Sequence, residues 1–525
     1  MLVFYNGVIH TMDKANPTAD AVIVVKDTIR QIGQLDVFQT MPRGATYVDL
    51  EGRTLIPGFN DAHVHIWKLG LLLTTQVDAR RDAAPDIPAI IRAFRDKASR
   101  LPPGTWLTGR GYNEAVLPEG RHPTRHDLDA ASPDHPIALT RTCGHMIVAN
   151  SRALELAGIT SDTAAPPGGV IALGDDGQPS GLLQETAMGL LTRVIPEPDD
   201  ETMGRAIREA LFHQLRLGIT SATDPLLTPS HLRVYRALDE GGDLAVRVNG
   251  LPIRRPDGGT ETLPLPEKYL SDMLRIDTVK FFADGGLSGA TAAISVPYKV
   301  TGTQGVLRFE TDELFELMWE AHSNGYRIAA HAIGDVAIEQ VLSVYEELHR
   351  RLPNGLRHRI EHLGLPRESH LWRCRALGVI AVPQTVFLPA LGTTFRHYLP
   401  DHYLPGCYPV SAMLDAELTV ALSSDAPVVP DDNPLLGIKA AIDRKDANGD
   451  PIAPDQRISA YEALYAYTMG GAIASGDEAN RGSLTVGKWA DMVVLSGDPL
   501  TTPPDELLNI HVDQTYVGGQ LVYER

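Results

Sequence analysis

Two histidines one residue apart close an apolar segment near the start of the chain, LIPGFNDAHVHI at residues 55–66. In a strand, His63 and His65 would point to the same side, because residues i and i+2 share a face. Such a pair can chelate a metal ion, but a short motif of this kind also occurs by chance in ordinary strands. Further ligands elsewhere in the chain are needed to decide between the two interpretations.

Four other residues end apolar β segments and could supply those ligands: Lys280 in VKFFADG, His331 in AAHAIGD, His362 in RIEHLG and Asp425 in LSSDAP. A charge or imidazole in such a segment is costly unless it has a partner. Imidazole and carboxylate ligands suit zinc or another divalent metal. Each residue also has a structural interpretation: a strand-end histidine can be a satisfied core residue, Asp425 can cap its loop, and Lys280 can pair with Asp284.

Apolar β segments alternate with helical patterns through the middle of the chain. Eight such segments are found, at residues 54–66, 217–224, 244–253, 275–285, 326–335, 356–364, 377–385 and 418–427. Eight strand–helix units predict an α/β fold, a (β/α)₈ TIM barrel, in which functional residues lie at the carboxyl ends of the strands. The histidines, the lysine and the aspartate would then meet at one mouth of the barrel.

The first connection of this barrel is abnormally long. It separates the first two strands by roughly 150 residues, far more than an ordinary connection needs, so we expect an inserted lid subdomain at about 68–200. Short β segments at both ends of the chain predict a composite β-sandwich domain from residues 1–56 and 480–525. The metal-dependent barrel would occupy residues 57–479.

Composition limits the partners. The 525 residues have a net charge of −19 with scattered acidic positions, which argues against nucleic acid and anionic membranes as partners. Three distant cysteines suggest a reducing compartment, and the sequence shows neither a signal peptide nor an apolar run of about 20 residues. We therefore expect a cytoplasmic protein that acts on a small molecule. A homodimer is a possible assembly.

Several segments, in this order, carry a family resemblance: LEGRTLIPGFNDAHVH, HPTRHDLDAASPDHPIALTRTCGHMIVANSRAL, VKFFADGGL, HAIGDVAIE, RIEHLG, SSDAPV and NRGSLTVGKWADMVVLSGDPL. With these the chain resembles the amidohydrolase superfamily. Within it, the chain is similar to the YtcJ-like amidohydrolases (amidohydrolase family 3), which include N-substituted formamide deformylase. The resemblance covers nearly the whole chain.

The resemblance implies a set of metal ligands: His63, His65, His331, His362 and Asp425. Lys280 stands where relatives can have a carboxylated lysine that bridges two metal ions. If Lys280 remains an amine, one ion is expected, held mainly by His331 and His362. The complete ligand set favours two ions, with zinc as the expected metal.

Substrate contacts are predicted for four more residues. His145, in TCGHMIVANS, matches a family segment that reaches the site, and we expect it to contact the substrate carbonyl or the tetrahedral oxyanion. Tyr112 and Trp67 are candidates for the pocket wall, and Asp284 for binding the substrate or orienting a ligand. The structural alternatives are a histidine of the lid for His145 and core packing for the two aromatic residues.

These features predict a metal-dependent amidohydrolase that cleaves a non-peptide C–N bond, in an amide or N-substituted formamide, with metal-activated water. Asp425 is the expected proton carrier. The alternatives are a cyclic amide or carbamate hydrolase, a metal-dependent decarboxylase or isomerase, and a catalytically silent regulatory relative. A silent relative should lack at least one of the six metal-site residues, and this chain has all of them. No residue identifies the acyl or amine group of the substrate.

Overall fold

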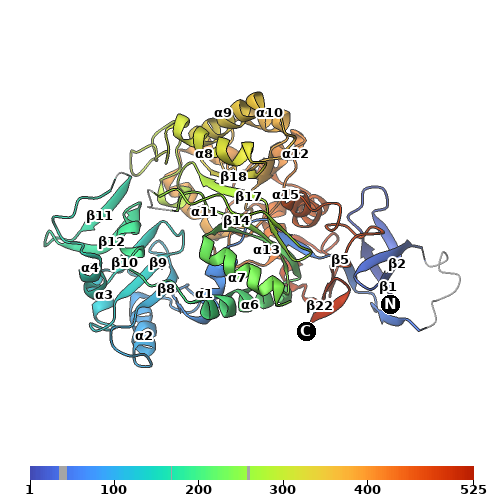
Figure 1. Cartoon of the computed structure of the whole chain (residues 1–525), viewed down its shortest axis with the longest axis horizontal. Helices are drawn as coiled ribbons and strands as arrows, with labels where there is room; N and C mark the ends of the chain where they lie inside the picture. The colour runs from blue at the N-terminus through green and yellow to red at the C-terminus, as the bar shows by residue number, and fades with distance from the viewer. Residues whose placement is uncertain (35–43, 167, 257–260) are drawn as a thin grey trace.

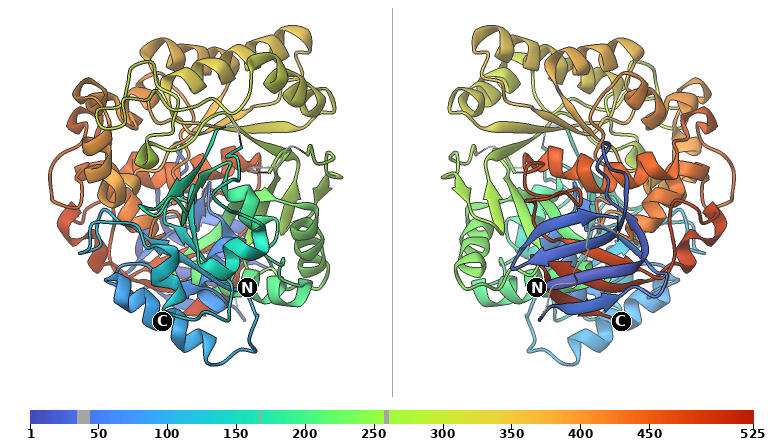
Figure 2. Two further views of the ribbon diagram at one scale, coloured as in Figure 1. Left: turned by 90° about the vertical axis from the view of Figure 1, so that its left-hand side faces the viewer. Right: turned by 90° about the vertical axis from the view of Figure 1, so that its right-hand side faces the viewer.

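The computed structural model describes residues 1–34, 44–166, 168–256 and 261–525. It has a central body of parallel strands and helices, with one β-rich part on each side (Figure 1). The two views of Figure 2 face these two parts in turn. Among the described residues, no helix is both long and apolar enough to cross a membrane.

Strands from the two ends of the chain pair in one eight-stranded sheet, in the order β23-β22-β21-β5-β1-β2-β3, with β4 paired to β1. Its strands are β1 (Leu2–His10), β2 (Thr18–Val25), β3 (Thr28–Gly33), β4 (Thr46–Asp49), β5 (Thr54–Pro57), β21 (Met492–Leu495), β22 (Val512–Val517) and β23 (Gln520–Glu524). The two ends meet where β21 runs antiparallel to β5. Because β5 leads directly into the first strand of the central body, this sheet fixes where that body begins.

The strands of the central body form two sheets. One has the order β15-β16-β14-β13-β6 and the other the order β17-β18-β19-β20. Their strands are β6 (Phe59–Asp61), β13 (Ile219–Leu227), β14 (Arg247–Pro252), β15 (Tyr269–Leu270), β16 (Leu274–Ile276), β17 (Thr278–Phe282), β18 (Arg327–Ala332), β19 (Arg359–His362) and β20 (Ile380–Val382). Apart from β15, which is antiparallel to β16, all these strands pair in parallel, so their carboxyl ends lie at one edge.

Isolated contacts connect the two sheets. Ile253 bridges Lys280 in parallel, and Ala381 bridges Val420 in the same sense. The amide of Ala62 donates to the carbonyl of Leu422 at 3.5 Å. The segment at 418–427 was predicted to be a full strand, but it makes only the single bridge at Val420. Asp425 lies beyond that bridge with a φ of 59°, outside the range of extended backbone.

Helices cover the outside of the central body (Figure 2): α6 (Asp200–Arg216), α7 (Pro229–Glu240), α8 (Thr311–Ser323), α9 (Asp335–Arg351), α10 (Glu368–Leu377), α11 (Phe387–Tyr398), α12 (Val410–Asp415), α13 (Pro434–Asp443), α14 (Ala460–Tyr465) and α15 (Gly471–Ser475). Helix α9 illustrates how they form. Its buried residues recur at helical spacing, at Ile338, Val341, Leu342, Tyr345 and Leu348. Arg350 and Arg351 lie in its last turn, where positive charge opposes the helix dipole favourably.

The long first connection forms a sheet of its own after helix α1 (Ile66–Thr74), with the order β11-β12-β10-β9-β8-β7. Its elements are β7 (Val77–Asp78), α2 (Ile87–Ala98), β8 (Leu107–Tyr112), α3 (Arg125–Asp129), β9 (Ile137–Arg141), β10 (Met146–Ala149), α4 (Ser151–Ala157), β11 (Gly169–Leu173), β12 (Pro179–Glu185) and α5 (Met188–Thr192). We call this part the insert. It lies on the side of the central body away from the terminal sheet (Figure 1). The hydroxyl of Thr142 donates to the carbonyl of Val428 at 2.6 Å, which ties the insert to the loop after Asp425.

Candidate metal centre

His63 and His65 follow the first strand of the central body. Strand β6 ends at Asp61, so the pair lies in the loop after the strand rather than within it, and His65 is the N-cap of α1. The side-chain alternation used to place both rings on one face therefore does not apply. Instead, the two rings lie perpendicular to each other, and the Nε2 atom of each approaches Asp425.

The donor atoms of these residues have the spacing of metal ligands. The Oδ1 atom of Asp425 lies 3.4 Å from His63 Nε2 and 3.1 Å from His65 Nε2. Ligands held about 2.0–2.1 Å from a tetrahedral zinc ion lie about 3.3–3.4 Å apart. One ligand atom from each of these buried residues lies within 4.8 Å of the other two. The residues present therefore fit a divalent metal ion.

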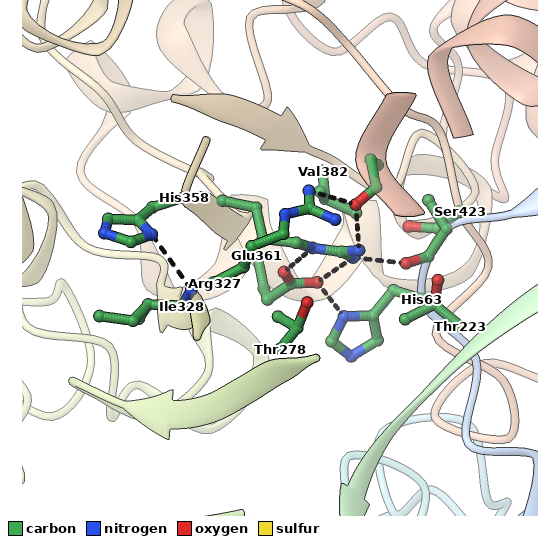
Figure 3. A network of polar contacts seen from close by, with 12 residues as sticks. His63, Thr223, Thr278, Arg327, Ile328, His358, Glu361, Val382 and Ser423 are labelled. Carbon is green, nitrogen blue, oxygen red and sulfur yellow. Dashed lines mark hydrogen bonds and ion pairs between the residues drawn. The ribbon is translucent and has the colours of Figure 1, made fainter. Parts of the chain in front are cut away.

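A buried carboxylate orients His63 from behind. Glu361 accepts a hydrogen bond from Nδ1 of His63 (Figure 3). Nε2 of that ring is left for Asp425. Arg359 in turn donates to Glu361, with Nε–Oε1 at 2.5 Å. Although burial opposes ionisation, Arg359 and the other nearby cations hold the pKa of Glu361 well below its ordinary value. Hydrogen bonding of this type fixes the tautomer of a ligating histidine and raises its basicity.

Sequence reasoning singled out His362 and missed its neighbour Glu361. In a regular strand adjacent residues point to opposite faces, so only one of the two would reach the site. His362 has a φ of 74°, in the left-handed region, where the alternation of the strand breaks. The arginine two residues before Glu361, on the same face of the strand, was the available signal for a buried ion pair.

His331 and His362 bring a second pair of imidazoles to the same place. Nδ1 of His362 bonds Oε1 of Gln384 at 2.7 Å, which leaves its Nε2 for another partner. Nε2 of His331 lies 3.0 Å from the carbonyl of Gly285, which leaves its Nδ1. The two ring centroids are 4.5 Å apart, and that of His362 is 5.1 Å from His63. Burial holds the pKa of both rings well below the ordinary value, so they are neutral, as metal ligands must be.

Lys280 lies among these ligands. It is on β17 with a side chain that is 1% exposed, and its Nζ is 5.2 Å from the centre of the Phe282 ring. It lines one cavity of about 70 Å³ together with the five other residues predicted as ligands, His63, His65, His331, His362 and Asp425. The structure thus brings all six predicted metal-site residues together.

His145 reaches the cavity from the insert. Its Nδ1 lies 3.1 Å from Oε2 of Glu185, and its ring centroid is 6.5 Å from that of His331. Burial disfavours the charged ring, but the charge and hydrogen bond of Glu185 outweigh it and raise the pKa of His145 to about 9. The ring is therefore a cation at neutral pH and can donate a hydrogen bond into the cavity. Glu185 and Arg308, which donates to it at 3.3 Å, were not singled out in the sequence.

The other predicted substrate contacts lie outside this cavity. Tyr112 is fully buried in the core of the insert, where its hydroxyl lies 3.1 Å from Nδ1 of His122. Asp284 is also fully buried, and its carboxylate accepts backbone amides of Ala293, Ile333 and Gly334 at 2.8–3.0 Å. Its carboxylate also lies 3.4 Å from His331 Nε2. Asp284 therefore contacts the backbone around the site and one proposed ligand. Trp67 stacks on His231 and lines an adjacent cleft instead.

The chain matches the model of a known family over residues 46–523, and the description of that family is the amidohydrolase family. It belongs to this family. The YtcJ protein of Bacillus subtilis (strain 168) is 30% identical over 100% of this chain and 99% of its own length. N-substituted formamide deformylase of Arthrobacter pascens is 30% identical over 100% of this chain and 98% of its own length. The resemblance expected from the sequence is confirmed.

Two solved structures are similar to this chain in fold. An uncharacterized metal-dependent hydrolase from Pyrococcus horikoshii OT3 superposes with a TM-score of 0.78 at 26% identity, over 96% of this chain and 99% of that one. Atrazine chlorohydrolase TrzN from Arthrobacter aurescens TC1, crystallised with zinc, shares the fold at 15% identity and a TM-score of 0.56, over 100% of this chain and 95% of that one. The chain is thus a member of a metal-dependent hydrolase family.

Proposed function

We propose that this protein hydrolyses a non-peptide C–N bond, in an N-substituted formamide or another small amide, at a divalent metal centre. The observation that supports this most directly is the set of donor distances from Asp425 to His63 and His65, which suit a metal ion. The relative from Arthrobacter pascens, named for deformylation of N-substituted formamides, supports the choice of bond. Zinc is the metal we expect, since the donors are imidazole nitrogen and carboxylate oxygen.

The residues that would hold the metal are His63, His65, His331, His362 and Asp425, and a carboxylated Lys280 would be a further ligand. A bound ion would lower the pKa of a water molecule and polarise the substrate carbonyl. The role we assign to Asp425 is proton transfer: its carboxylate would take a proton from the attacking water and give it to the leaving nitrogen. Burial raises the pKa of the Asp425 carboxyl, which favours a group that both takes and returns a proton.

His145 is proposed to stabilise the negative charge that develops on the carbonyl oxygen. Its Nδ1 faces Glu185, so Nε2 is the atom directed away from that carboxylate. A cation kept charged by Glu185 is a stronger donor to an oxyanion than a neutral imidazole would be. Water then adds across the C–N bond, and the products are the free acid and the free amine.

The proposed frame for this chemistry is a (β/α)₈ barrel of residues 57–479, closed by the contacts of Lys280, Val420 and Ala62. The insert at about 68–200 is its lid, and residues 1–56 and 480–525 form a separate β domain. The parallel pairing of the central strands supports the barrel. The contribution of His145 from the insert to the cavity supports the lid.

A product screen tests the proposed function. The enzyme loaded with zinc or manganese is offered N-substituted formamides, simple N-acyl amines, lactams and cyclic carbamates, and released amine and acid are measured. The variant Asp425→Asn, loaded in the same way, is the blank. Metal-dependent release of amine from an acyclic amide supports the proposal, and loss of CO₂ or isomerisation without amine release would replace it with a different reaction.

A further inference from the structure

Arg110, on β8 of the insert, is a buried cation beside the metal centre. Its side chain lines the cavity that contains the proposed ligands, and the residue is only 6% exposed. Its one hydrogen bond is from Nη2 to the carbonyl of Thr142, at 3.4 Å, and Nε is buried with no hydrogen-bond partner among the described residues. A buried charge without a partner is costly, so a guanidinium placed in this way suggests an anionic ligand.

A second buried arginine of the insert shows the usual arrangement. Arg141, which is 1% exposed, donates from Nε and Nη2 to the two oxygens of Glu114 at 2.7 and 2.9 Å. In the described part of the chain, Arg110 forms no such ion pair with a carboxylate. Asp425 is the carboxylate whose negative charge acts on the Arg110 guanidinium, and Asp425 is already assigned as a proposed metal ligand.

The backbone leaves room in front of the Arg110 guanidinium. Gly144 has a φ of 76°, and a Cβ atom at this position would lie 3.2 Å from Nη2 of Arg110. A side chain at position 144 would therefore strain the backbone and crowd the cation. The glycine, which also lines the cavity, therefore leaves space beside the guanidinium.

The charge of the cavity wall also favours an anion. Four cationic side chains line it, those of Lys68, Arg110, Lys280 and the charged His145, and Asp425 is the single carboxylate among the described lining residues. A metal ion would add further positive charge. Even if Lys280 is carboxylated, the positive charges of Lys68 and Arg110 remain in the cavity wall.

Arg110 stands where two spaces meet. The catalytic cavity of about 70 Å³ and a cleft of about 840 Å³ share the lining residues Lys68, Arg110, Gly144 and Leu226. The small cavity has room for a short acyl group beside the metal ligands, and the cleft is large enough for the rest of a substrate. Several walls of the cleft are apolar: Trp67, Met188, Leu190, Met203, Val234 and Ile253.

We propose that Arg110 binds a carboxylate next to the scissile nitrogen, so that the substrates are short-chain N-acyl amino acids with an apolar side chain. The acyl group enters the small cavity, the carboxylate meets Arg110 at the junction, and the side chain lies in the apolar cleft. A planar guanidinium suits this role because it can bind a carboxylate through two parallel hydrogen bonds. This inference rests on the proposed amide hydrolysis and names its substrate class.

A matched pair of substrates tests the inference on the metal-loaded enzyme. N-formyl-DL-phenylalanine and N-formyl-2-phenylethylamine differ only by the carboxylate. We expect kcat/KM to be higher for the acid, and Arg110→Met to lower it for the acid about 100-fold, mainly through KM, with less than about a threefold change for the neutral amide. Arg110→Lys should restore part of the loss. Equal losses for both substrates would overturn the carboxylate assignment while leaving amide hydrolysis intact.

Binding separates this inference from the proposed function. Calorimetric titration of phenylalanine into the metal-loaded protein should show binding that Arg110→Met weakens about 100-fold, whereas 2-phenylethylamine should bind equally weakly to both proteins. If neither formamide is hydrolysed but this difference is measured, the proposed reaction fails and the carboxylate site stands. If phenylalanine binds the variant as well as the wild type, the site is refuted. Arg95→Met, which removes an exposed arginine of α2 in the insert, is the control and should change neither measurement.

Discussion

The backbone amide of Asp425 donates to the carbonyl of His63 at 2.7 Å, and the carboxylate of the same aspartate lies 3.4 Å from Nε2 of that histidine. The first and last functional segments of the central body are thus joined by both backbone and side chain. Asp61 strengthens the connection, because it accepts the amide of His63 at 3.2 Å and that of Ser424 at 3.0 Å. The position of Asp425 is therefore held by hydrogen bonds from the backbone of its own segment to His63 and Asp61.

This arrangement makes Asp425→Asn a clean test of the proton carrier. The amide keeps the size of the carboxylate and the backbone bond to His63, but it cannot accept the proton. We expect kcat to fall by about 10²–10⁴-fold, the usual contribution of general acid–base catalysis. Metal content, measured by elemental analysis, should stay close to that of the wild type.

The control removes a carboxylate elsewhere: Asp498→Asn lies in the terminal part of the chain, where Asp498 contacts His10, and should leave turnover unchanged. Near-normal turnover in Asp425→Asn, with metal retained, would exclude Asp425 as the proton carrier.

The imidazoles of His331 and His362 should hold a metal ion together. We expect the double variant His331→Ala/His362→Ala to lose about one equivalent of metal per chain, because the remaining site offers too few ligands. Elemental analysis after dialysis checks this result. His213→Ala, which removes a histidine bonded to Asp432 outside the cavity, is the control, and an unchanged metal content in the double variant would contradict the ligand assignment.

The sequence predicted which residues meet at the cavity better than it predicted the residues that hydrogen-bond to them. His63, His65, Lys280, His331 and His362 each stand at or near the end of an apolar segment, and parallel strands bring such ends to one edge. Nothing local connects Glu361 to His63 or Gln384 to His362, because these contacts depend on how distant strands lie against one another. Residues that hydrogen-bond to a histidine from a distant strand can therefore be identified only from the tertiary structure.

The insert was the part least open to prediction. Its length and place between two strands were visible, but its six-stranded sheet was not, since short mixed segments give weak periodicity. Tyr112 was a candidate for the pocket wall with core packing as the alternative, and it packs in the core of the insert. Arg110, two residues earlier on the same strand, reaches the cavity and was not noticed. The register of β8 shifts between Arg110 and Tyr112, and Gly111 has a φ of 107°, so the alternation of a regular strand does not place these two side chains together.

Gln384 should control the metal affinity of the site through His362. Its Oε1 accepts from His362, while its Nε2 donates to the carbonyl of Val382 and to Ser423, each at 2.9 Å. Gln384→Leu removes the acceptor that orients the ring, and we expect metal affinity to fall about 10–100-fold, the usual effect of such partners. Competition with a chelator of known affinity measures this change.

Gln384→Glu is the matched variant, because it keeps an acceptor for Nδ1 of His362 and should retain metal affinity to within about threefold of the wild type. Thermal unfolding of the metal-free proteins separates the effect on affinity from an effect on folding. Equal metal affinity in Gln384→Leu and in the wild type would show that His362 does not need this partner or does not bind metal.

His145 should give the reaction an alkaline limit. Since Glu185 raises the pKa of this ring to about 9, the imidazolium is present at neutral pH and is lost as the pH rises through about 9. The ion pair with Glu185 stabilises the fold in full below pH 6.5, the ordinary histidine pKa, and this stabilisation is lost as the pH rises through about 9.

We expect kcat to fall above about pH 9 in the wild type. His145→Gln should lower kcat about 10²–10³-fold at pH 7 and should show no further fall above pH 9. Turnover measured from pH 6 to 10, with metal content as the control, checks both results, and an unchanged rate in His145→Gln would leave the ring with a structural role in the insert.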